Sequence, residues 1–129
     1  MSLSILLIED NEQNRYLATF LLEKHGHRVT CARDGLRGIE LASTLRPDVI
    51  LLDIQIPAMD GHMVARALRQ ISALDATPII AVTSYAMMGD REKALAAGCN
   101  GYMEKPVDPD SFVAEVEGYA AQKPRSSES

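Results

Sequence analysis

Residues 49–61 have the sequence VILLDIQIPAMDG, in which four consecutive apolar residues are followed at once by Asp53. A short, continuous apolar run is typical of a strand that is buried on both faces, as in a parallel sheet covered by helices. Residues 5–8 and 79–82 form two further runs of the same character. We therefore expect a parallel sheet, with Asp53 at the carboxyl end of one of its buried strands.

Strand-like and helical segments alternate along the whole chain. Besides the three apolar runs, residues 29–32 and 101–104 are predicted to be short strands. Apolar residues at helical spacing predict helices at residues 11–25, from 34 to about 45, across 64–71, at about 89–97 and after 108. Five strand–helix units of this kind predict an α/β fold, in which helices cover both faces of a doubly wound, five-stranded parallel sheet.

The ends and the buried faces of these helices can also be predicted. Asp34 and Asp108 are suitable N-cap residues, and Pro109 suits the first position of the last helix. In the first helix, Leu17, Phe20, Leu21 and Lys24 lie at helical spacing.

Length and composition indicate one globular domain. The chain has 129 residues, 47% of them hydrophobic, which is enough to bury a core without disulfides or a structural metal. We place the domain at residues 1–121 and expect residues 122–129, which include no apolar residue, to be a disordered tail. Cys31 and Cys99 have no metal-site or disulfide spacing and are expected to be reduced core residues.

Charge and hydropathy exclude several classes of partner. A net charge of −5 argues against nucleic acid and against an anionic membrane surface. The apolar run at residues 5–8 is too short for a signal sequence or a membrane span. We therefore expect a cytoplasmic protein that binds neither nucleic acid nor membrane.

Polar residues follow four of the predicted strands. They are Glu9, Asp10, Asp53, Thr83 and Lys105. Taken singly, the acidic pair would be explained as a solvated helix start, Thr83 as a strand-end hydroxyl and Lys105 as a surface lysine. Because the carboxyl ends of parallel strands share one edge of the sheet, we expect these residues to converge there.

Carboxylates crowded at one edge repel one another unless a cation lies between them. Hard oxygen ligands on loops suit Mg²⁺, although the ligand types alone do not exclude Ca²⁺. We expect Asp10, Asp53 and the backbone carbonyl of Gln55 to be direct Mg²⁺ ligands, and Glu9 to hold a metal-bound water.

An aspartate beside a metal ion can attack phosphorus and form an aspartyl-phosphate. Such chemistry consists mostly of positioning and charge neutralisation. Lys105 is placed to neutralise one phosphoryl oxygen, and the Thr83 hydroxyl to donate a hydrogen bond to another. These residue types therefore predict phosphorylation of Asp53.

The same residues resemble the response-regulator receiver family over nearly the whole chain, from about residue 3 to 121. The pattern D-x-x-x-P-x-x-D-G with a distant K-P is specific, whereas an acidic pair alone would be weak. The chain is most similar to the single-domain members of the family. The segments that carry the resemblance are IEDN at 8–11, DIQIPAMDG at 53–61, VTS at 82–84 and YMEKP at 102–106.

This resemblance implies a flavodoxin-like sheet with strand order 2-1-3-4-5. It implies that Asp53 accepts a phosphoryl group from a histidine kinase or a histidine phosphotransferase in the presence of Mg²⁺. Glu9 and Asp10 would form the acid pair, Thr83 would be the switch hydroxyl, and Lys105 would contact the phosphate. The expected activity is limited to phosphorylation and dephosphorylation of Asp53, so the chain is expected not to be an enzyme.

Four further assignments follow from the resemblance. The Lys105–Pro106 peptide bond is expected to be cis. Tyr102 matches the switch aromatic, which would turn inward when Thr83 moves toward the phosphate. Gln55 and Tyr85 lie at the family's variable positions, and a bulky Tyr85 would shield the acyl phosphate and slow its hydrolysis.

The output of such a domain would be a change in protein contacts. We expect the fourth helix, the last strand and the last helix to form the output face, and the chain to be a monomer or a weak dimer. Met87 and Met88 could instead simply pack a loose helix start. The expected apolar patch on this face consists of Tyr85, Met87, Met88, Tyr102, Val107 and Tyr119.

Three alternatives remain at this level. An aspartate-dependent phosphatase would place an acid where Gln55 stands, and it would turn over a small phosphate ester. A flavin or nucleotide module would need a Ser/Thr/Gly-rich loop after the first strand, where this chain has acids at 9–12. The third alternative is a receiver fragment of a larger regulator or hybrid kinase.

Overall fold

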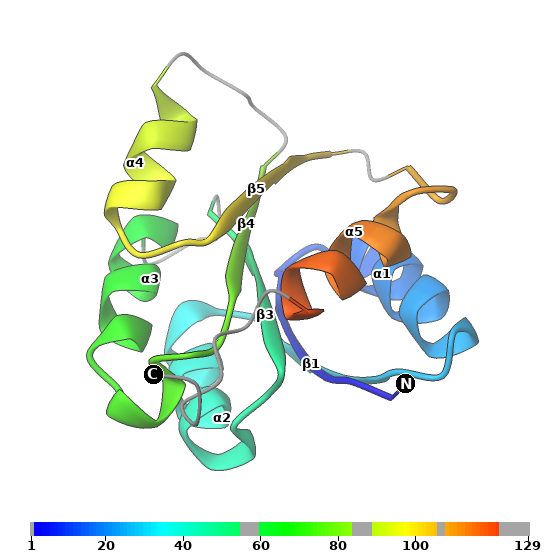
Figure 1. The fold of residues 1–129 in the computed structure, drawn as a ribbon, viewed down its shortest axis with the longest axis horizontal. Coiled ribbons are helices and arrows are strands. Elements are labelled where there is room, and N and C mark those ends of the chain that lie inside the picture. Colours follow the sequence, from blue (N-terminus) through cyan, green and yellow to red (C-terminus); the bar gives the residue numbers. More distant parts are fainter. Residues whose placement is uncertain (1, 55–59, 84–88, 106–107, 122–129) are drawn as a thin grey trace.

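The computed structural model describes residues 2–54, 60–83, 89–105 and 108–121, and it contains a five-stranded sheet with helices on both faces (Figure 1). The strands are β1 (Ser4–Ile8), β2 (Arg28–Ala32), β3 (Val49–Asp53), β4 (Ile79–Thr83) and β5 (Gly101–Glu104). The helices are α1 (Glu12–Lys24), α2 (Gly35–Leu45), α3 (Gly61–Arg69), the short 3₁₀ helix η1 (Ser72–Leu74), α4 (Asp90–Ala96) and α5 (Phe112–Ala121).

All strand pairs are parallel, and the strand order is β2-β1-β3-β4-β5, which confirms the predicted flavodoxin-like topology. β3 lies in the middle of the sheet, and all five of its residues are buried. Ile50 is paired with Leu6 of β1 and with Ile79 of β4. The apolar run at 49–52 is therefore continuous because helices cover both faces of this strand.

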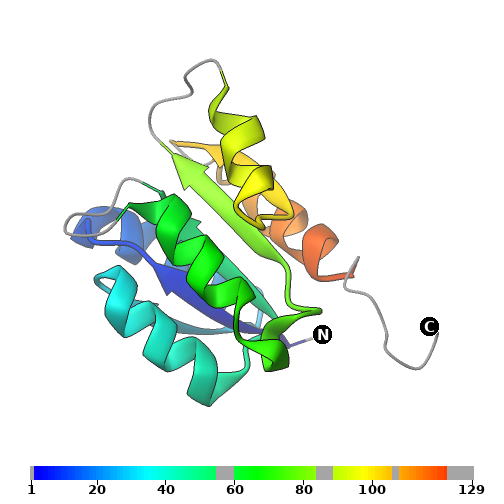
Figure 2. The same cartoon turned by 90° about the vertical axis from the view of Figure 1, so that its left-hand side faces the viewer.

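Alternate residues of each strand supply two separate apolar cores. On one face, Leu6 and Ile50 pack in a cluster that includes residues of α2, α3 and α4. On the other face, Leu7 and Leu51 pack with residues of α1 and α5. Figures 1 and 2 show the resulting three layers, with α2, α3 and α4 on one side of the sheet and α1 and α5 on the other. No helix in these described ranges is long and apolar enough to cross a membrane.

One of the two predicted N-caps is confirmed, whereas the other lies before the start of its helix. The Asp34 side chain accepts a hydrogen bond from the backbone N–H of Arg37 at 2.8 Å, which confirms it as the N-cap of α2. The carbonyl of Asp108 accepts from the N–H of Phe112 at 2.8 Å. However, Pro109 belongs to a turn before α5, so the regular helix begins three residues later than predicted.

The buried face of α1 agrees only in part with the predicted stripe. Phe20 is 52% exposed and Leu17 is 36% exposed, whereas Ala18, Leu21 and Leu22 are buried. Leu21 of the predicted stripe therefore faces the core, whereas Leu17 and Phe20 of the same stripe do not. Only one of the two cysteines belongs to the core, since Cys99 is buried and Cys31, on the edge strand β2, is exposed. Both are free thiols.

The Arg69 side chain joins three connecting segments at the amino-terminal edge of the sheet, opposite the edge that carries Asp53. The Arg69 guanidinium donates to the carbonyl oxygens of Gly98 (2.8 Å), Leu74 (2.8 Å) and Thr77 (2.9 Å), and to the side-chain oxygen of Asn100 (2.5 Å). These bonds attach the end of α3 to η1 and to the loop between α4 and β5. Burial lowers the pKa of Arg69, although it remains charged.

A buried histidine attaches α5 to the start of the sheet. The Nδ1 atom of His27 accepts from the backbone N–H of Leu3 at 3.1 Å, and its Nε2 atom lies 2.6 Å from a carboxylate oxygen of Glu117. Because Nδ1 is an acceptor, Nε2 carries the proton and donates to Glu117. This contact fixes the second half of α5 at the end of the molecule opposite Asp53.

Arg69→Met should lower the free energy of unfolding by about 2–4 kcal/mol, because it removes three part-buried hydrogen bonds to backbone carbonyl oxygens and an exposed one to Asn100. Urea denaturation followed by circular dichroism measures the change. Arg66→Met is the matched control, since Arg66 is exposed on the same helix. Equal losses in the two variants would show that the hydrogen bonds of Arg69 contribute no specific stability.

Candidate active site

Four strands end at one edge of the sheet, and the predicted polar residues stand at these ends. Glu9 and Asp10 follow β1, Asp53 is the last residue of β3, and Thr83 is the last residue of β4. Lys105 directly follows β5. The register pairs Ile8 with Leu52 and Thr83 with Glu104, so the neighbouring strands end at about the same level along the strand direction. The parallel topology therefore brings together residues that are up to 96 positions apart in the sequence.

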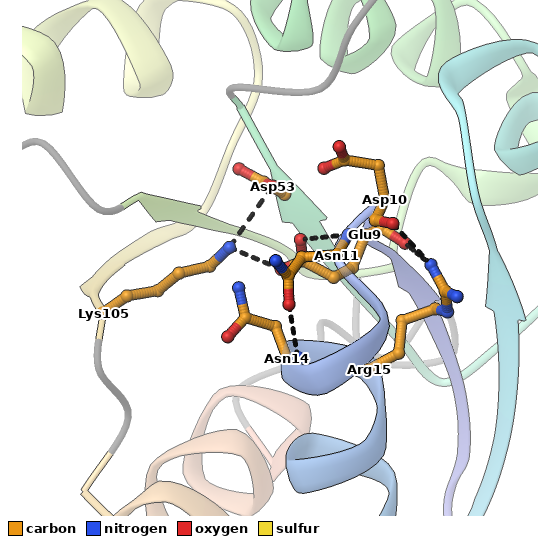
Figure 3. A network of polar contacts seen from close by, with 7 residues as sticks. All are labelled: Glu9, Asp10, Asn11, Asn14, Arg15, Asp53 and Lys105. Atoms are coloured by element: carbon orange, nitrogen blue, oxygen red, sulfur yellow. Dashed lines mark hydrogen bonds and ion pairs between the residues drawn. The ribbon is translucent and has the colours of Figure 1, made fainter.

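Lys105 lies between two buried carboxylates (Figure 3). Its Nζ atom is 2.5 Å from Oε1 of Glu9 and 3.3 Å from Oδ2 of Asp53. Glu9 is only 3% exposed and Asp53 only 4%. Two negative charges at this depth would be costly without a cation, and the ammonium group supplies one.

The loop after β1 is held by backbone-directed contacts. The N–H of Asn11 donates to Oε2 of Glu9 at 3.1 Å. The Arg15 guanidinium donates to the carbonyl oxygens of Glu9 (3.0 Å) and Asp10 (2.8 Å). Figure 3 shows Arg15 reaching back from α1 to this loop. Sequence reasoning missed Arg15, and its position in the first turns of a helix that starts beside the acidic pair is the only signal for it.

Electrostatics at Glu9 are dominated by burial. Burial raises the pKa of Glu9, the hydrogen bond from Lys105 opposes this rise, and the neighbouring Asp53 adds to it. The site thus holds a carboxyl group that is harder to ionise than an exposed one.

The acidic residues form a group that fits a metal ion. Glu9, Asp10 and Asp53 can each offer one carboxylate oxygen, and these three atoms lie within 4.8 Å of one another. Asp10 is exposed, so a cation can reach the cluster from solvent. Three carboxylates and one ammonium leave an excess of negative charge, and carboxylate oxygens are the donors that Mg²⁺ prefers. The residues present therefore fit a divalent cation.

Thr83 ends β4 next to this cluster, and Tyr102 lies on the neighbouring strand β5. Thr83 is fully buried, and its carbonyl accepts from the N–H of Lys105 at 2.7 Å. Tyr102 is partly buried and packs against the core under α4. Its hydroxyl oxygen is buried and has no hydrogen-bond partner among the residues that the structure describes. Burial, followed by the charges of Asp90 and Glu104, raises the pKa of this hydroxyl.

A small cavity lies directly beneath the cluster. Its volume is about 50 Å³, and Asp53, Glu9 and Lys105 form its polar end. Apolar side chains from both the sheet and the two helices of that face form the rest, among them Leu7, Leu17, Ala18, Leu51, Val82 and Phe112. Asn14 also borders it. The charged end of the site thus rests on an apolar floor, which limits water around Asp53 from below.

Several predicted residues lie outside the described ranges. They are Gln55 with its carbonyl, Tyr85, Met87, Met88, Pro106 with the expected cis bond, Val107 and the tail at 122–129. Of the predicted site residues that are described, Glu9, Asp10, Asp53 and Lys105 come together as one cluster, with Thr83 adjoining it on β4. Tyr119 of the expected apolar patch packs against Gly101 of β5, where a methyl group would overlap its ring.

Comparisons with known proteins agree with this geometry. The response regulator receiver domain family matches residues 5–117. The polar-differentiation response regulator DivK of Brucella anthropi is 39% identical over 119 residues, which cover 92% of this chain and 97% of that protein. The protein of the same name from Brucella ovis is 38% identical over 119 residues, with the same coverage.

Solved structures show the same fold. The receiver domain of the sensor histidine kinase PA1611 from Pseudomonas aeruginosa PAO1 has a TM-score of 0.86 and 35% identity, and the match covers 94% of this chain and 99% of that domain. That structure has a magnesium ion coordinated in its active-site cleft. The chemotaxis protein CheY4 of Vibrio cholerae has a TM-score of 0.87 and 26% identity, with 92% and 99% coverage.

Glu9 should make the stability of the chain depend on pH. Because the pKa of Glu9 is raised in the folded state, the folded chain binds more protons than the unfolded chain between the ordinary carboxyl pKa and the raised one. The contribution of Glu9 to the free energy of unfolding therefore decreases as the pH rises through that window.

Glu9→Gln should remove this contribution, so the free energy of unfolding should decrease less steeply with rising pH. Urea denaturation without divalent ions, from about pH 4 to about pH 7, measures this slope. Glu12→Gln is the control, because Glu12 is exposed at the start of α1. If both variants keep the wild-type slope, the raised pKa of Glu9 is wrong.

Proposed function

This chain belongs to the response regulator receiver domain family, and we propose that Asp53 is its phosphoacceptor in a two-component phosphorelay. The observation that carries this proposal is the contact of the Lys105 ammonium with Asp53, beside the acid pair Glu9 and Asp10. The donor is a phosphohistidine of a histidine kinase or of a histidine phosphotransferase. The product is an aspartyl-phosphate that changes which protein the chain binds.

The transfer needs little covalent chemistry from the protein. A carboxylate oxygen of Asp53 attacks the phosphorus atom, the P–N bond to the donor histidine breaks, and its electron pair returns to the imidazole, which then takes a proton from solvent. Lys105 already touches Asp53, so its charge stands where phosphoryl oxygens would collect. The Thr83 hydroxyl, at the end of the neighbouring strand, donates to one of these oxygens.

Mg²⁺ is the proposed cofactor, and when bound it supplies charge neutralisation for the phosphoryl oxygens. Asp10, Asp53 and the backbone carbonyl of Gln55 would hold it directly, and Glu9 would hold it through a water molecule. The mutual closeness of the three carboxylates supports this assignment. The magnesium-bound receiver domain of PA1611 supports it by similarity.

The output face consists of α4, β5 and α5. Thr83 and Tyr102 lie on adjacent strands, so a shift of Thr83 toward the phosphoryl group opens room into which the Tyr102 ring can move. To change the chain from mostly inactive to mostly active, phosphorylation must favour one state by roughly 3 to 5 kcal/mol. Charge-assisted hydrogen bonds from Thr83 and Lys105 to the phosphoryl group are of sufficient strength.

We also propose that the chain acts in the cytoplasm as a monomer or a weak dimer. It has no substrate other than the phosphodonor, and its activity is limited to phosphorylation and hydrolysis at Asp53. Residues 1–121 form the receiver domain.

Incubation with Mg²⁺ and a small acyl-phosphate donor should add one phosphoryl group to Asp53, because the site positions both the nucleophile and its neutralising charge. Intact-mass spectrometry measures the gain. The gain should disappear without Mg²⁺ and after treatment with hydroxylamine, which cleaves acyl phosphates.

Asp53→Asn is the matched control, since it keeps the shape of the side chain but removes the nucleophile. If the small donor gives no gain, the assay is repeated with purified phosphohistidine proteins. A chain that gains no phosphoryl group from either source would contradict the proposed function.

Tyr85→Ala should speed the loss of phosphate from phosphorylated Asp53 by roughly tenfold, because removal of a bulky side chain admits water to the acyl phosphate. The half-life of the phosphorylated mass measures this effect. Tyr16→Ala, on the exposed face of α1, is the control. An unchanged half-life in Tyr85→Ala would contradict the shielding role.

A further inference from the structure

The acid pair lies in the turn between β1 and α1. Glu9 and Asp10 are the two residues between the end of β1 and Asn11, the N-cap of α1. The backbone N–H of Glu9 still continues the sheet, since it donates to the carbonyl of Ala32 at 2.9 Å. The side chain of Asn11 already caps the helix by accepting from the N–H of Asn14 at 2.9 Å. The chain thus changes from strand to helix at the acid pair, and the direction of the Asp10 side chain depends on how this turn is held.

One nitrogen atom of Arg15 spans the turn (Figure 3). Its Nη1 atom donates to the carbonyl oxygens of both Glu9 (3.0 Å) and Asp10 (2.8 Å). In an extended strand, consecutive carbonyls point to opposite sides, so one donor can reach both only where the chain turns. Arg15 therefore stabilises the turn itself, from the helix into which the turn leads.

The guanidinium of Arg15 binds backbone oxygens and leaves the carboxylates accessible. Within the residues that the structure describes, Arg15 forms no ion pair with a carboxylate, although the acid pair is adjacent. Lys105 differs, because it contacts the carboxylates of Glu9 and Asp53 directly. The Asp10 carboxylate meanwhile stays close to those of Glu9 and Asp53, with one oxygen of each within 4.8 Å of the others.

We propose that Arg15 is a positioning residue for the divalent-cation site, and that it acts by holding the backbone of Glu9 and Asp10. This inference rests on the proposed function in one respect, namely that the cation is the Mg²⁺ assigned to this cluster. Loss of a group that orients metal ligands without touching the metal commonly weakens metal binding by about 10- to 100-fold.

Positioning and charge have opposite effects at this site. A positive charge beside the cluster repels a cation, so loss of the Arg15 charge alone would strengthen Mg²⁺ binding. Loss of the two hydrogen bonds to the turn would weaken it, because the Asp10 carboxylate would no longer be held beside the other two. The sign of the change in affinity therefore distinguishes the two roles.

The test measures Mg²⁺ affinity by titrating MgCl₂ into the ¹⁵N-labelled full chain and following the amide chemical shifts of Asp10 and its neighbours. Arg15→Met should raise the Kd about tenfold, because methionine fills similar space but cannot donate a hydrogen bond. The same spectra show whether the variant is folded, since the amide shifts of Leu74 and Thr77, at the opposite edge of the sheet, should stay unchanged.

Arg33→Met is the matched control, because Arg33 is exposed and directly follows β2 at the same edge of the sheet. It removes the same charge and should leave the Kd within about twofold of the wild-type value. Arg15→Lys keeps the charge and a donor group but not the guanidinium geometry, so its Kd should lie between those of the wild type and Arg15→Met. If Arg15→Met does not fold, weaker Mg²⁺ binding in Arg15→Lys than in the wild type is still expected, and equal binding would overturn the proposal.

A second measurement tests the turn without metal. The N–H of Asn11 donates to Oε2 of Glu9 at 3.1 Å, and the N–H of Glu9 donates to Ala32. Both amides should exchange hydrogen faster in metal-free Arg15→Met than in metal-free wild type, because the turn opens more often. Equal exchange in Arg15→Met and Arg33→Met would show that Arg15 does not hold the turn and would overturn the proposal.

The outcomes separate this proposal from the proposed function. A Kd in Arg15→Met that is equal to or lower than that of Arg33→Met would overturn the positioning role and leave the Mg²⁺ site and the phosphorylation of Asp53 untouched. A wild type without a saturable Mg²⁺ shift would contradict the metal site itself, and the role of Arg15 toward it would be wrong as well. Selective weakening in Arg15→Met supports the proposal whether or not Asp53 accepts a phosphoryl group.

Discussion

The contact of the Lys105 ammonium with Glu9 and Asp53 is the interaction on which this structure depends. Two carboxylates that are 96% or more buried cannot remain charged without a nearby cation. Lys105 comes from the end of β5 and reaches past β4 to β3 and β1, which lie next to each other in the strand order β2-β1-β3-β4-β5. The topology is thus needed for charge balance as well as for burial of the apolar runs.

Burying these charged groups lowers the stability of the domain. Contacts elsewhere in the fold must therefore offset this cost. The raised pKa of Glu9 shows that its surroundings disfavour its charge. The contacts that fix the opposite end of the molecule are consistent with this requirement, because Arg69 binds four oxygen acceptors there and His27 binds Glu117. Both contacts lie far from Asp53, so they stabilise the fold without restricting the reactive edge.

The sequence was sufficient to predict the features that depend on local apolar patterns and on the parallel topology. Continuous apolar runs predict the buried strands, and the rule for strand ends predicts that Glu9, Asp53 and Lys105 lie together. The contact line of α1 was predictable only in part, because Leu21 is buried while Phe20 at the same helical spacing remains exposed and the small Ala18 is buried in its place. The Arg69 and His27 contacts were not predictable either, since they join positions that share no local pattern and are set by tertiary packing alone.

The edge position of β5 explains how one site could affect a distant surface. β5 has four residues and one neighbouring strand, so its displacement breaks fewer hydrogen bonds than displacement of β3 would. Its residues alternate between the buried Gly101 and Met103 and the more accessible Tyr102 and Glu104. Lys105, directly after it, is fixed to Asp53. A change of charge at Asp53 therefore acts on the end of a short edge strand, and Tyr102 and Glu104 of that strand line a surface hollow together with Arg91 of α4 and Glu115 of α5.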